Sequence, residues 1–379
     1  MKENRLFPKK CRRALLALAA AGLLSLSGAL AADYAYRGHA VTLIKSSRSV
    51  HDDNFEYLCQ NGGRMVLDEF GTEKPGLIAR LSRELADAAE CQVVLLCTQT
   101  GYQRQVLEKL VPLLHGGQVL LIDPGYLATA FVLGLNPPEG LIIAEAESNF
   151  IDGRISRPGR FKVGFRNVRN PLGIYPRAAV PQARETLDQM GTPFAYLESV
   201  VEAALHNPNM IVHTVGAIMS IPRIEATGGE YCMYHEVFTP SVWNILEALD
   251  GEKMAVLQSL GYEALPYVEA CKFRNSLDEQ RPGKEVFFEY AAMPTRAKGP
   301  VSVDSRYITE DVPQGLVLLE SLGRALHIAT PVASALIEIA SAALGRPLRA
   351  QGRTLDALGH EIVDQILDDA RGGKSPCHV

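Results

Sequence analysis

A histidine in the middle of the chain is the residue that could most directly do chemistry. It lies in the stretch Asn207-Pro-Asn-Met-Ile-Val-His213-Thr-Val-Gly216. Asn207 can cap a helix, Pro208 suits the first helical position, and Asn209 lies one turn before His213 on the same face. Because an imidazole takes up and releases protons near neutral pH, the stretch predicts a general acid or base. A structural histidine on an ordinary helix is the alternative.

A second group of polar residues stands in the segment Arg306-Tyr-Ile-Thr-Glu-Asp311-Val-Pro. Glu310 and Asp311 come directly before Val312-Pro313, where a helix is expected to start. From the residues alone, Asp311 can be a helix cap or first-turn acid as well as a catalytic carboxylate, and Arg306 can be a surface arginine. No cluster of His, Asp or Glu has the spacing of metal ligands, so we predict no metal site.

A candidate nucleotide-binding turn lies near the N-terminus. Residues 14–21 predict a strand and residues 26–37 a helix, with Gly22 at the turn between them. Such a unit at the start of an open parallel sheet binds dinucleotides, with the pyrophosphate at the helix N-terminus. Only the first glycine of the GxGxxG pattern is present, because Leu24 and Ser27 occupy the other two positions.

The residues after the second predicted strand bear on the choice of cofactor. An NAD enzyme carries an acidic residue there for the ribose 2′-hydroxyl, but this chain has Lys45, Ser46 and Arg48. These side chains suit a 2′-phosphate, so they predict NADP, with NAD as the alternative cofactor. An exposed polar loop is the other reading. Thr98, which follows a later strand, is predicted to join the same cofactor site.

Composition limits the class of protein. The 379 residues are long enough for two domains, and 47% hydrophobic with 21% charged residues is typical of a soluble globular protein. With a net charge of −5 and no long basic block, we predict no nucleic-acid partner. The apolar stretch near the N-terminus is Ala-rich and interrupted by Ser25, Ser27 and Gly28, so we predict no membrane partner. Seven scattered cysteines without a CxxC pair indicate reduced thiols rather than a disulfide framework.

The N-terminal segment allows two interpretations. Residues 1–32 carry basic residues, an apolar run and Ala29-Leu-Ala31, which is the pattern of a signal peptide. Cleavage after Ala31 would remove the first predicted strand and half of the first helix, and it would expose the core. We therefore predict residues 14–37 as the first βα unit of a cytoplasmic protein. Export of a cleaved chain is the alternative.

The pattern of apolar segments divides the chain near residue 190. Before this point short apolar runs alternate with helical segments, which predicts a parallel sheet, and beyond it strand-like runs all but vanish. We predict an α/β Rossmann-type N-terminal domain with a parallel sheet over 1–190 and an all-helical C-terminal domain over 191–379. The predicted strands are 14–21, 40–44, 92–97, 118–123, 141–145, 161–165 and 178–180 in one sheet; the predicted helices are 26–37, 77–89, 103–114, 197–220, 240–260, 262–273, 312–326, 330–344 and 354–371, with a loop-rich stretch at 275–305.

The helical half carries a series of short motifs in a fixed order. With Asn209-x-x-x-His213, this series closely resembles the octopine/nopaline (opine) dehydrogenase family over roughly residues 196–360, and more loosely in the first domain. The motifs are Glu230-Tyr-Cys-Met-Tyr-His-Glu-Val-Phe-Thr-Pro-Ser-Val242, Leu249-Asp-Gly-Glu252, Gly299-Pro300, Arg306-Tyr-Ile-Thr-Glu-Asp311-Val-Pro-Gln-Gly315-Leu, Thr330-Pro331 and Gly352-Arg-Thr-Leu355; those of the first domain are Arg37-Gly-His39, Asp123-Pro-Gly125 and Ala144-Glu145.

The resemblance implies an NAD(P)-dependent oxidoreductase that acts on CH–NH groups. Members of this family condense an amino acid with a 2-keto acid and reduce the imine with hydride, so both are expected partners here. The family's catalytic histidine falls on His213 and its partner aspartate on Asp311. Arg306 matches the residue that binds the keto acid, and Asn209 a residue expected to touch substrate. The sequence does not fix the oligomeric state; a homodimer is an expectation.

The incomplete glycine pattern supports a second hypothesis. Leu24 and Ser27 would have abolished dinucleotide binding in a non-catalytic family member, which would then act as a metabolite-binding protein. Room for a pyrophosphate beside residues 22–27 distinguishes the two hypotheses.

Overall fold

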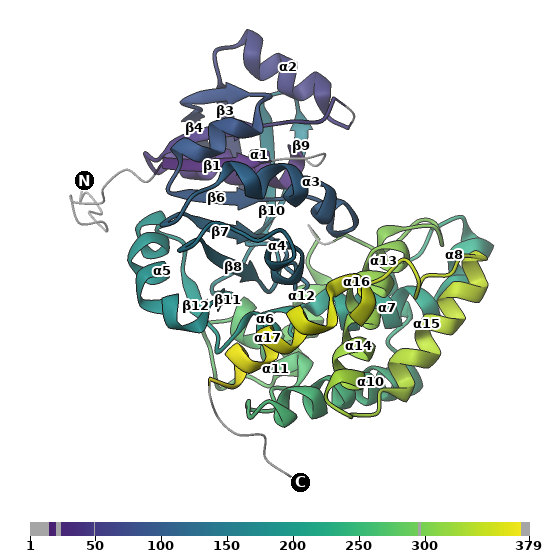
Figure 1. The fold of residues 1–379 in the computed structure, drawn as a ribbon. Helices are drawn as coiled ribbons and strands as arrows, with labels where there is room; N and C mark the ends of the chain where they lie inside the picture. Colours follow the sequence, from purple (N-terminus) through teal and green to yellow (C-terminus); the bar gives the residue numbers. More distant parts are fainter. Residues whose placement is uncertain (1–14, 20–23, 49, 295–296, 373–379) are drawn as a thin grey trace.

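The computed structural model describes residues 15–19, 24–48, 50–294 and 297–372. An α/β domain comes first along the chain and a helical domain follows it (Figure 1). The predicted fold class is therefore confirmed. Within the described residues, no helix combines the length and the apolar character that crossing a membrane requires.

The large sheet has the strand order of a dinucleotide-binding fold. Its central strands β6 and β7 are buried along their whole length, as expected for a parallel sheet that is covered on both faces. All neighbours from β5 to β8 pair in parallel, whereas β11 runs antiparallel to β8. The described residues give the order β12 (Phe194–Tyr196), β11 (Asn170–Tyr175), β8 (Ile142–Ala146), β7 (Val119–Ile122), β6 (Val93–Leu96), β1 (Leu15–Ala19), β2 (Ala40–Ile44) and β5 (Arg80–Ser82).

The predicted first βα unit is confirmed. Strand β1 lies between β2 and β6, and it is followed by helix α1 (Leu24–Tyr36). The direction of strand order reverses between β1 and β6, and in open α/β sheets ligands bind beyond the carboxyl ends of the strands at such a reversal.

A second sheet, which the sequence did not predict, covers the other side of α1. Its described strands, in order, are β4 (Thr72–Leu77), β3 (Arg64–Glu69), β10 (Arg160–Arg166) and β9 (Ile151–Arg157). The predicted strand 161–165 is real, but assigning it to the large sheet was wrong, because it pairs with β3 and β9. Gly28 of α1 permits the close packing: a Cβ there would lie 2.3 Å from the Phe161 ring.

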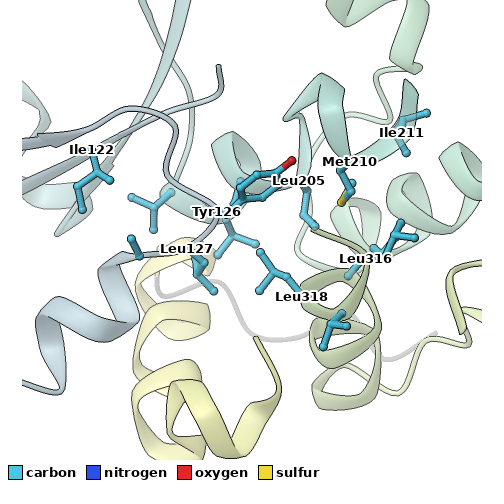
Figure 2. Close-up of a cluster of buried hydrophobic side chains, with 14 of the residues drawn as sticks. Ile122, Tyr126, Leu127, Leu205, Met210, Ile211, Leu316 and Leu318 are labelled. Carbon is cyan, nitrogen blue, oxygen red and sulfur yellow. The ribbon is translucent and has the colours of Figure 1, made fainter. Parts of the chain in front are cut away.

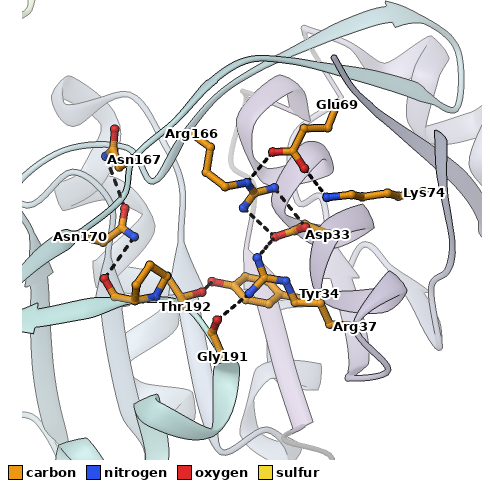
Figure 3. A network of polar contacts seen from close by, with 11 residues as sticks. Asp33, Tyr34, Arg37, Glu69, Lys74, Arg166, Asn167, Asn170, Gly191 and Thr192 are labelled. Carbon is orange, nitrogen blue, oxygen red and sulfur yellow. Dashed lines mark hydrogen bonds and ion pairs between the residues drawn. The ribbon is translucent and has the colours of Figure 1, made fainter. Parts of the chain in front are cut away.

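Polar contacts tie the C-terminal end of α1 to both sheets (Figure 3). The buried carboxylate of Asp33 accepts hydrogen bonds of 3.0 and 3.1 Å from Arg166 of β10 and pairs with Arg37 at 2.7 Å. The Tyr34 hydroxyl is 2.9 Å from Thr192 Oγ1, just before β12. These contacts fix the helix whose N-terminus faces the reversal point of the large sheet.

Two predicted elements of the first domain were wrong. Residues 77–89 were expected to form a helix, but they contain the end of β4, strand β5 and most of a 3-10 helix, η1 (Leu85–Glu90). Residues 178–180 were expected to form a strand, but a 3-10 turn leads there into α5 (Val180–Leu187), which has a proline in its first turn. Helix α3 (Gln103–Leu110) lies where a helix was predicted. Helices α2 (Asp52–Gln60) and α4 (Thr129–Leu133) complete the described helices of this part.

The first helix of the helical domain, α6, begins at Val200. Residues 194–196 before it form β12 and belong to the large sheet. The boundary near residue 190 stays a prediction. Helix α12 lies inside the stretch expected to be loop-rich. The described helices are α6 (Val200–Leu205), α7 (Pro208–Met219), α8 (Ile221–Thr227), α9 (Met233–Glu236), α10 (Pro240–Ser259), α11 (Tyr267–Asn275), α12 (Gly283–Ala292), α13 (Arg306–Thr309), the π-helical segment η6 (Val312–Leu316), α14 (Val317–Ala325), α15 (Pro331–Leu344), α16 (Leu355–Leu358) and α17 (His360–Arg371).

One hydrophobic cluster spans both domains (Figure 2). Ile122 and Leu127 of the first domain belong to the same buried cluster as Leu205, Met210 and Leu316 of the helical domain. The two domains therefore share a continuous core. Because this core is closely packed, a residue of one domain is held at a fixed distance from a residue of the other.

Candidate active site

Helix α7 starts as the sequence predicted. The side chain of Asn207 accepts a hydrogen bond of 2.9 Å from the Asn209 N–H, and Pro208 occupies the first turn. Asn209 and His213 line the same cavity, as their one-turn spacing indicated.

His213 and Asp311 form a close pair. The His213 Nδ1 atom lies 2.8 Å from Asp311 Oδ2, although 98 residues separate the two in sequence. Because a carboxylate only accepts hydrogen bonds, we assign the proton to Nδ1, and Nε2 is then the atom that can exchange a proton. The Tyr307 ring stacks on the imidazole with 3.7 Å between ring centroids. The pair is thus fixed in distance and in ring orientation.

Asp311 does not cap the helical segment that follows it, since its carboxylate makes no capping hydrogen bond there. Its Oδ1 atom accepts a 3.0 Å hydrogen bond from the Tyr126 hydroxyl instead. Burial raises the pKa of the Asp311 carboxyl above its ordinary value, while the hydrogen bonds from His213 and Tyr126 oppose that rise.

Two adjoining cavities meet beside this pair. We call the first the histidine cavity; it has about 220 Å³, and His213, Asn209 and Tyr307 are in its wall. The second, the sheet-edge cavity, has about 240 Å³ and lies at the ends of β6 and β7. The walls of both include Asn149, Ile151, Asp152 and Arg154; the remaining lining of the sheet-edge cavity is Ser25, Leu26, Cys97, Thr98, Asp123, Pro124, Gly153 and Arg306.

Arg306 lies in the wall of the sheet-edge cavity, and its side chain is half exposed. Its Nε atom pairs with Glu310. Glu310 also accepts two hydrogen bonds of 2.7 Å, from the backbone N–H and the hydroxyl of Thr100 in the first domain. The guanidinium of Arg306 is therefore held in place by a carboxylate that also bonds to the first domain.

The sheet-edge cavity lies where open α/β sheets bind dinucleotides, beyond the carboxyl ends of the strands and beside the first turn of α1. Ser25, in the first turn of α1, and Thr98, the second residue after β6, are in its wall, and that first turn carries no acidic residue. Asp123 is also in its wall, and burial raises the pKa of this carboxyl well above its ordinary value. Gly22, predicted to contact the cofactor, lies outside the described residues.

The loop after β2 is organised around a buried lysine. Lys45 is fully buried, and its ammonium donates to the Ser47 carbonyl at 2.7 Å and pairs with Asp52 at 3.4 Å. Ser46 and Arg48 are exposed on the same loop. Lys45 thus orders the loop in this structure, and contact of Lys45, Ser46 or Arg48 with a 2′-phosphate stays a prediction.

Four contacts around the pair were not predicted from the sequence: those of Tyr126, Tyr307 and Thr100, and the pairing of Glu310 with Arg306. Tyr307 and Glu310 lie inside the Arg306–Asp311 block, so their place in that motif was an available signal. Tyr126 follows the Asp123-Pro-Gly125 motif directly. Thr100 carries no local signal, since its role depends on a carboxylate 210 residues away. Among the described residues, no three His, Cys, Asp or Glu side chains come together in a group that could hold a metal ion.

His206, just before the start of α7, should make stability depend on pH. Burial, with Lys253 and Arg274 nearby, lowers its pKa to about 3. The unfolded chain therefore takes up this proton near pH 6.5 and the folded chain does not, so stability falls as the pH drops below 6.5. We expect a loss of about 2 kcal/mol from this residue between pH 7 and pH 5.

Chemical denaturation at several pH values measures this effect. A His206→Leu variant should show a flatter pH dependence than the wild type, and exposed His360→Leu should leave it unchanged. Equal slopes for His206→Leu and the wild type would contradict the assignment.

The fold and the site together define a two-domain protein in which a Rossmann-type sheet meets a helical domain beside a partly buried His–Asp pair. Residues 196–344 match the family model described as NAD/NADP octopine/nopaline dehydrogenase, alpha-helical domain. This match covers most of the helical domain and confirms the resemblance to the opine dehydrogenase family found in the sequence.

Similar proteins extend over both domains. An opine dehydrogenase of Arthrobacter sp. (strain 1C) is 26% identical over 76% of this chain and 80% of its own. A vitopine synthase of Allorhizobium ampelinum is 23% identical over 93% and 98%. A solved octopine dehydrogenase with NADH and L-arginine superposes with a TM-score of 0.71 at 13% identity, over 97% and 100% of the two chains. A yersinopine dehydrogenase with NADP⁺ gives 0.70 at 17%, over 96% and 100%.

Proposed function

We propose that this protein is an NAD(P)H-dependent opine dehydrogenase. In the proposed reaction, the amino group of an amino acid condenses with the carbonyl of a 2-keto acid and water leaves. Hydride from the reduced nicotinamide and one proton then convert the C=N bond to a secondary amine. The cofactor supplies the hydride, and the protein positions the groups and supplies the proton.

One observation carries the proposal. A His–Asp pair opens onto a cavity that adjoins a second cavity at the carboxyl ends of the parallel strands. Arg306 lies in the wall of the second cavity, close to the shared residues. An acid–base group thus lines one cavity and an arginine lines the adjoining dinucleotide-type cavity, an arrangement that suits reduction of an imine between two acids.

Each residue then has a defined role in the proposal. His213 donates a proton from Nε2 to the carbonyl or imine, and Asp311 stabilises the imidazolium and fixes its tautomer. Arg306 binds the keto-acid carboxylate through its terminal nitrogens, while Glu310 holds its Nε. Asn209, in the wall of the histidine cavity, contacts the amino acid.

For the cofactor we propose NADP rather than NAD. Support comes from the absence of an acid directly after β2, where Lys45 stands, and from the exposed Ser46 and Arg48 on that loop. Thr98 and the turn at Gly22 would hold the nucleotide. Related solved structures contain either NADH or NADP⁺. The cavity beside Ser25 and Leu26 is where the pyrophosphate would lie in this proposal.

A screen tests the function directly. Purified protein is mixed with NADPH or NADH and with pairs of 2-keto and amino acids, and cofactor oxidation is followed by absorbance. We expect oxidation that requires both substrates. Nucleotide binding is measured separately by the fluorescence of the reduced cofactor. The absence of binding to both nucleotides would overturn the proposal.

Replacing Arg306 should mainly weaken binding of the keto acid. An Arg306→Leu variant loses the charge-assisted hydrogen bonds to the substrate carboxylate, so KM for the keto acid should rise about 100-fold. Arg306 also lines the sheet-edge cavity, so the KM for NADPH is measured alongside and should rise less than the KM for the keto acid. Arg306→Lys keeps the charge but loses the planar fork, so its KM for the keto acid should lie between those of the wild type and Arg306→Leu. An unchanged KM for the keto acid would remove Arg306 from this role.

A further inference from the structure

The carboxylate of Asp311 has a second partner, which comes from the other domain. The Tyr126 hydroxyl donates to Asp311 Oδ1 at 3.0 Å, while Oδ2 bonds to His213. Tyr126 is only 1% exposed, and its hydroxyl lies between the loop after β7 and the helical domain (Figure 2). Both oxygens of the carboxylate are therefore used, one by each domain.

The backbone around Tyr126 is held in an uncommon conformation. Tyr126 and Leu127 have φ values of +54° and +63°, in the left-handed region that such residues seldom adopt. The carboxylate of Glu145 accepts from the Leu127 N–H at 2.7 Å and from the Thr129 N–H at 2.6 Å. Gly125 makes room for that carboxylate, since a Cβ there would lie 2.0 Å from Glu145 Oε2.

A buried arginine completes the support. Arg353 of the helical domain is 1% exposed and donates to the Gly125 carbonyl at 3.0 Å and to the Tyr126 carbonyl. The Tyr126 ring also meets η6, where a Cβ on Gly315 would lie 3.2 Å from the ring. Strained backbone conformations that the surrounding structure fixes are found where a side chain must keep one orientation for function.

We propose that Tyr126 is a positioning residue for the His213–Asp311 pair: its hydroxyl orients Asp311 and keeps the carboxylate ionised for His213. This inference rests on the proposed function for its kinetic consequences, but the hydrogen bond acts on Asp311 whether or not a substrate is found. Burial and the neighbouring Asp311 raise the pKa of the Tyr126 hydroxyl well above its ordinary value, so it remains a donor at working pH.

The charges that face Asp311 set the direction of the effect. His213 lies on α7, Tyr126 on the loop after β7, and Glu310 precedes Asp311 on its own segment. Arg306 on α13 interacts electrostatically with Asp311, and Arg353 interacts in the same way with Tyr126. Burial and Glu310 favour the neutral carboxyl of Asp311, whereas His213 and the Tyr126 hydrogen bond favour the ionised carboxylate. Removing the Tyr126 hydrogen bond should raise the pKa of Asp311.

The test is a Tyr126→Phe variant, which keeps the ring and removes the hydroxyl. We expect kcat to fall about tenfold with KM little changed, and the acid limb of the pH–rate profile to move up by about one pH unit. In an Asp311→Asn background the same change should add little, because the two residues act on one interaction. An unshifted acid limb together with a fully additive loss would overturn the proposal.

A measurement without turnover separates this inference from the proposed function. In nuclear magnetic resonance titrations of the His213 ring, identified with a His213→Asn variant, the inflection that reports Asp311 should move to higher pH in Tyr126→Phe. With 3-fluorotyrosine at position 126, whose hydroxyl is a stronger donor, it should move to lower pH. Tyr34→Phe is the matched control, because Tyr34 is also buried but its hydroxyl bonds Thr192 rather than Asp311, and it should move nothing. If no substrate pair is turned over but these shifts appear, the proposed function fails and the role of Tyr126 stands; no shift in either direction overturns it.

Discussion

Replacing His213 by alanine should lower kcat for imine reduction by ~10²–10⁴-fold, the range that a general acid contributes. The variant removes the proton donor. Asp311 loses its hydrogen bond to His213 and keeps the one from Tyr126. The sheet-edge cavity does not include His213 in its wall, so affinity for NADPH should change little. Steady-state kinetics with the substrate pair found by screening, and titration of cofactor fluorescence, measure the two effects separately.

The chain offers a matched control for this experiment. His360 and Asp356 also form a His–carboxylate pair, at 2.9 Å, but both side chains are exposed on the surface of the helical domain. A His360→Ala variant should keep wild-type turnover. Wild-type turnover in His213→Ala would remove His213 from the reaction, and loss of cofactor affinity would indicate a structural role instead.

Replacing Arg353 by methionine should produce the largest loss of stability. Burial lowers the pKa of Arg353 to about 10, so the side chain is still charged at neutral pH. It donates to Gln314 at 2.8 Å, to Gln103 at 2.6 Å and to two carbonyls of the first domain. Methionine would fill the space but leave these acceptors unpaired, and breaking such a buried cluster costs about 3–5 kcal/mol.

Thermal and chemical denaturation measure this loss, and Tm should fall by roughly 10 °C. Arg346→Met is the control, because Arg346 pairs with Asp304 on the surface and should contribute little. Activity of Arg353→Met at low temperature should also fall, since Arg353 holds the Tyr126 carbonyl. Equal stability of Arg353→Met and Arg346→Met would contradict a structural role for the buried cluster.

The parallel sheet was predictable because buried strands leave a strong local signal. Strands β6 and β7 are short apolar runs without polar interruptions, and they alternate with helices at the spacing of βαβ units. Strand β5 gave no such signal. The apolar residues of 77–89 recur at a helical spacing, but parallel pairing with β2, which is remote in sequence, decides their conformation. The same holds for β10, whose pairing with β3 joins segments almost a hundred residues apart.

For the site, the sequence by itself determined the capped start of α7, the one-turn spacing of Asn209 and His213, and a motif that contains Arg306 and Asp311. These are local features, set by neighbouring residues. Only the tertiary structure brought Asp311 to 2.8 Å from His213, turned it away from its helix start, and added Tyr126 from 185 residues away. The physical reason is that a buried carboxylate must find hydrogen-bond donors wherever the fold presents them, and packing of the two domains decides which donors those are.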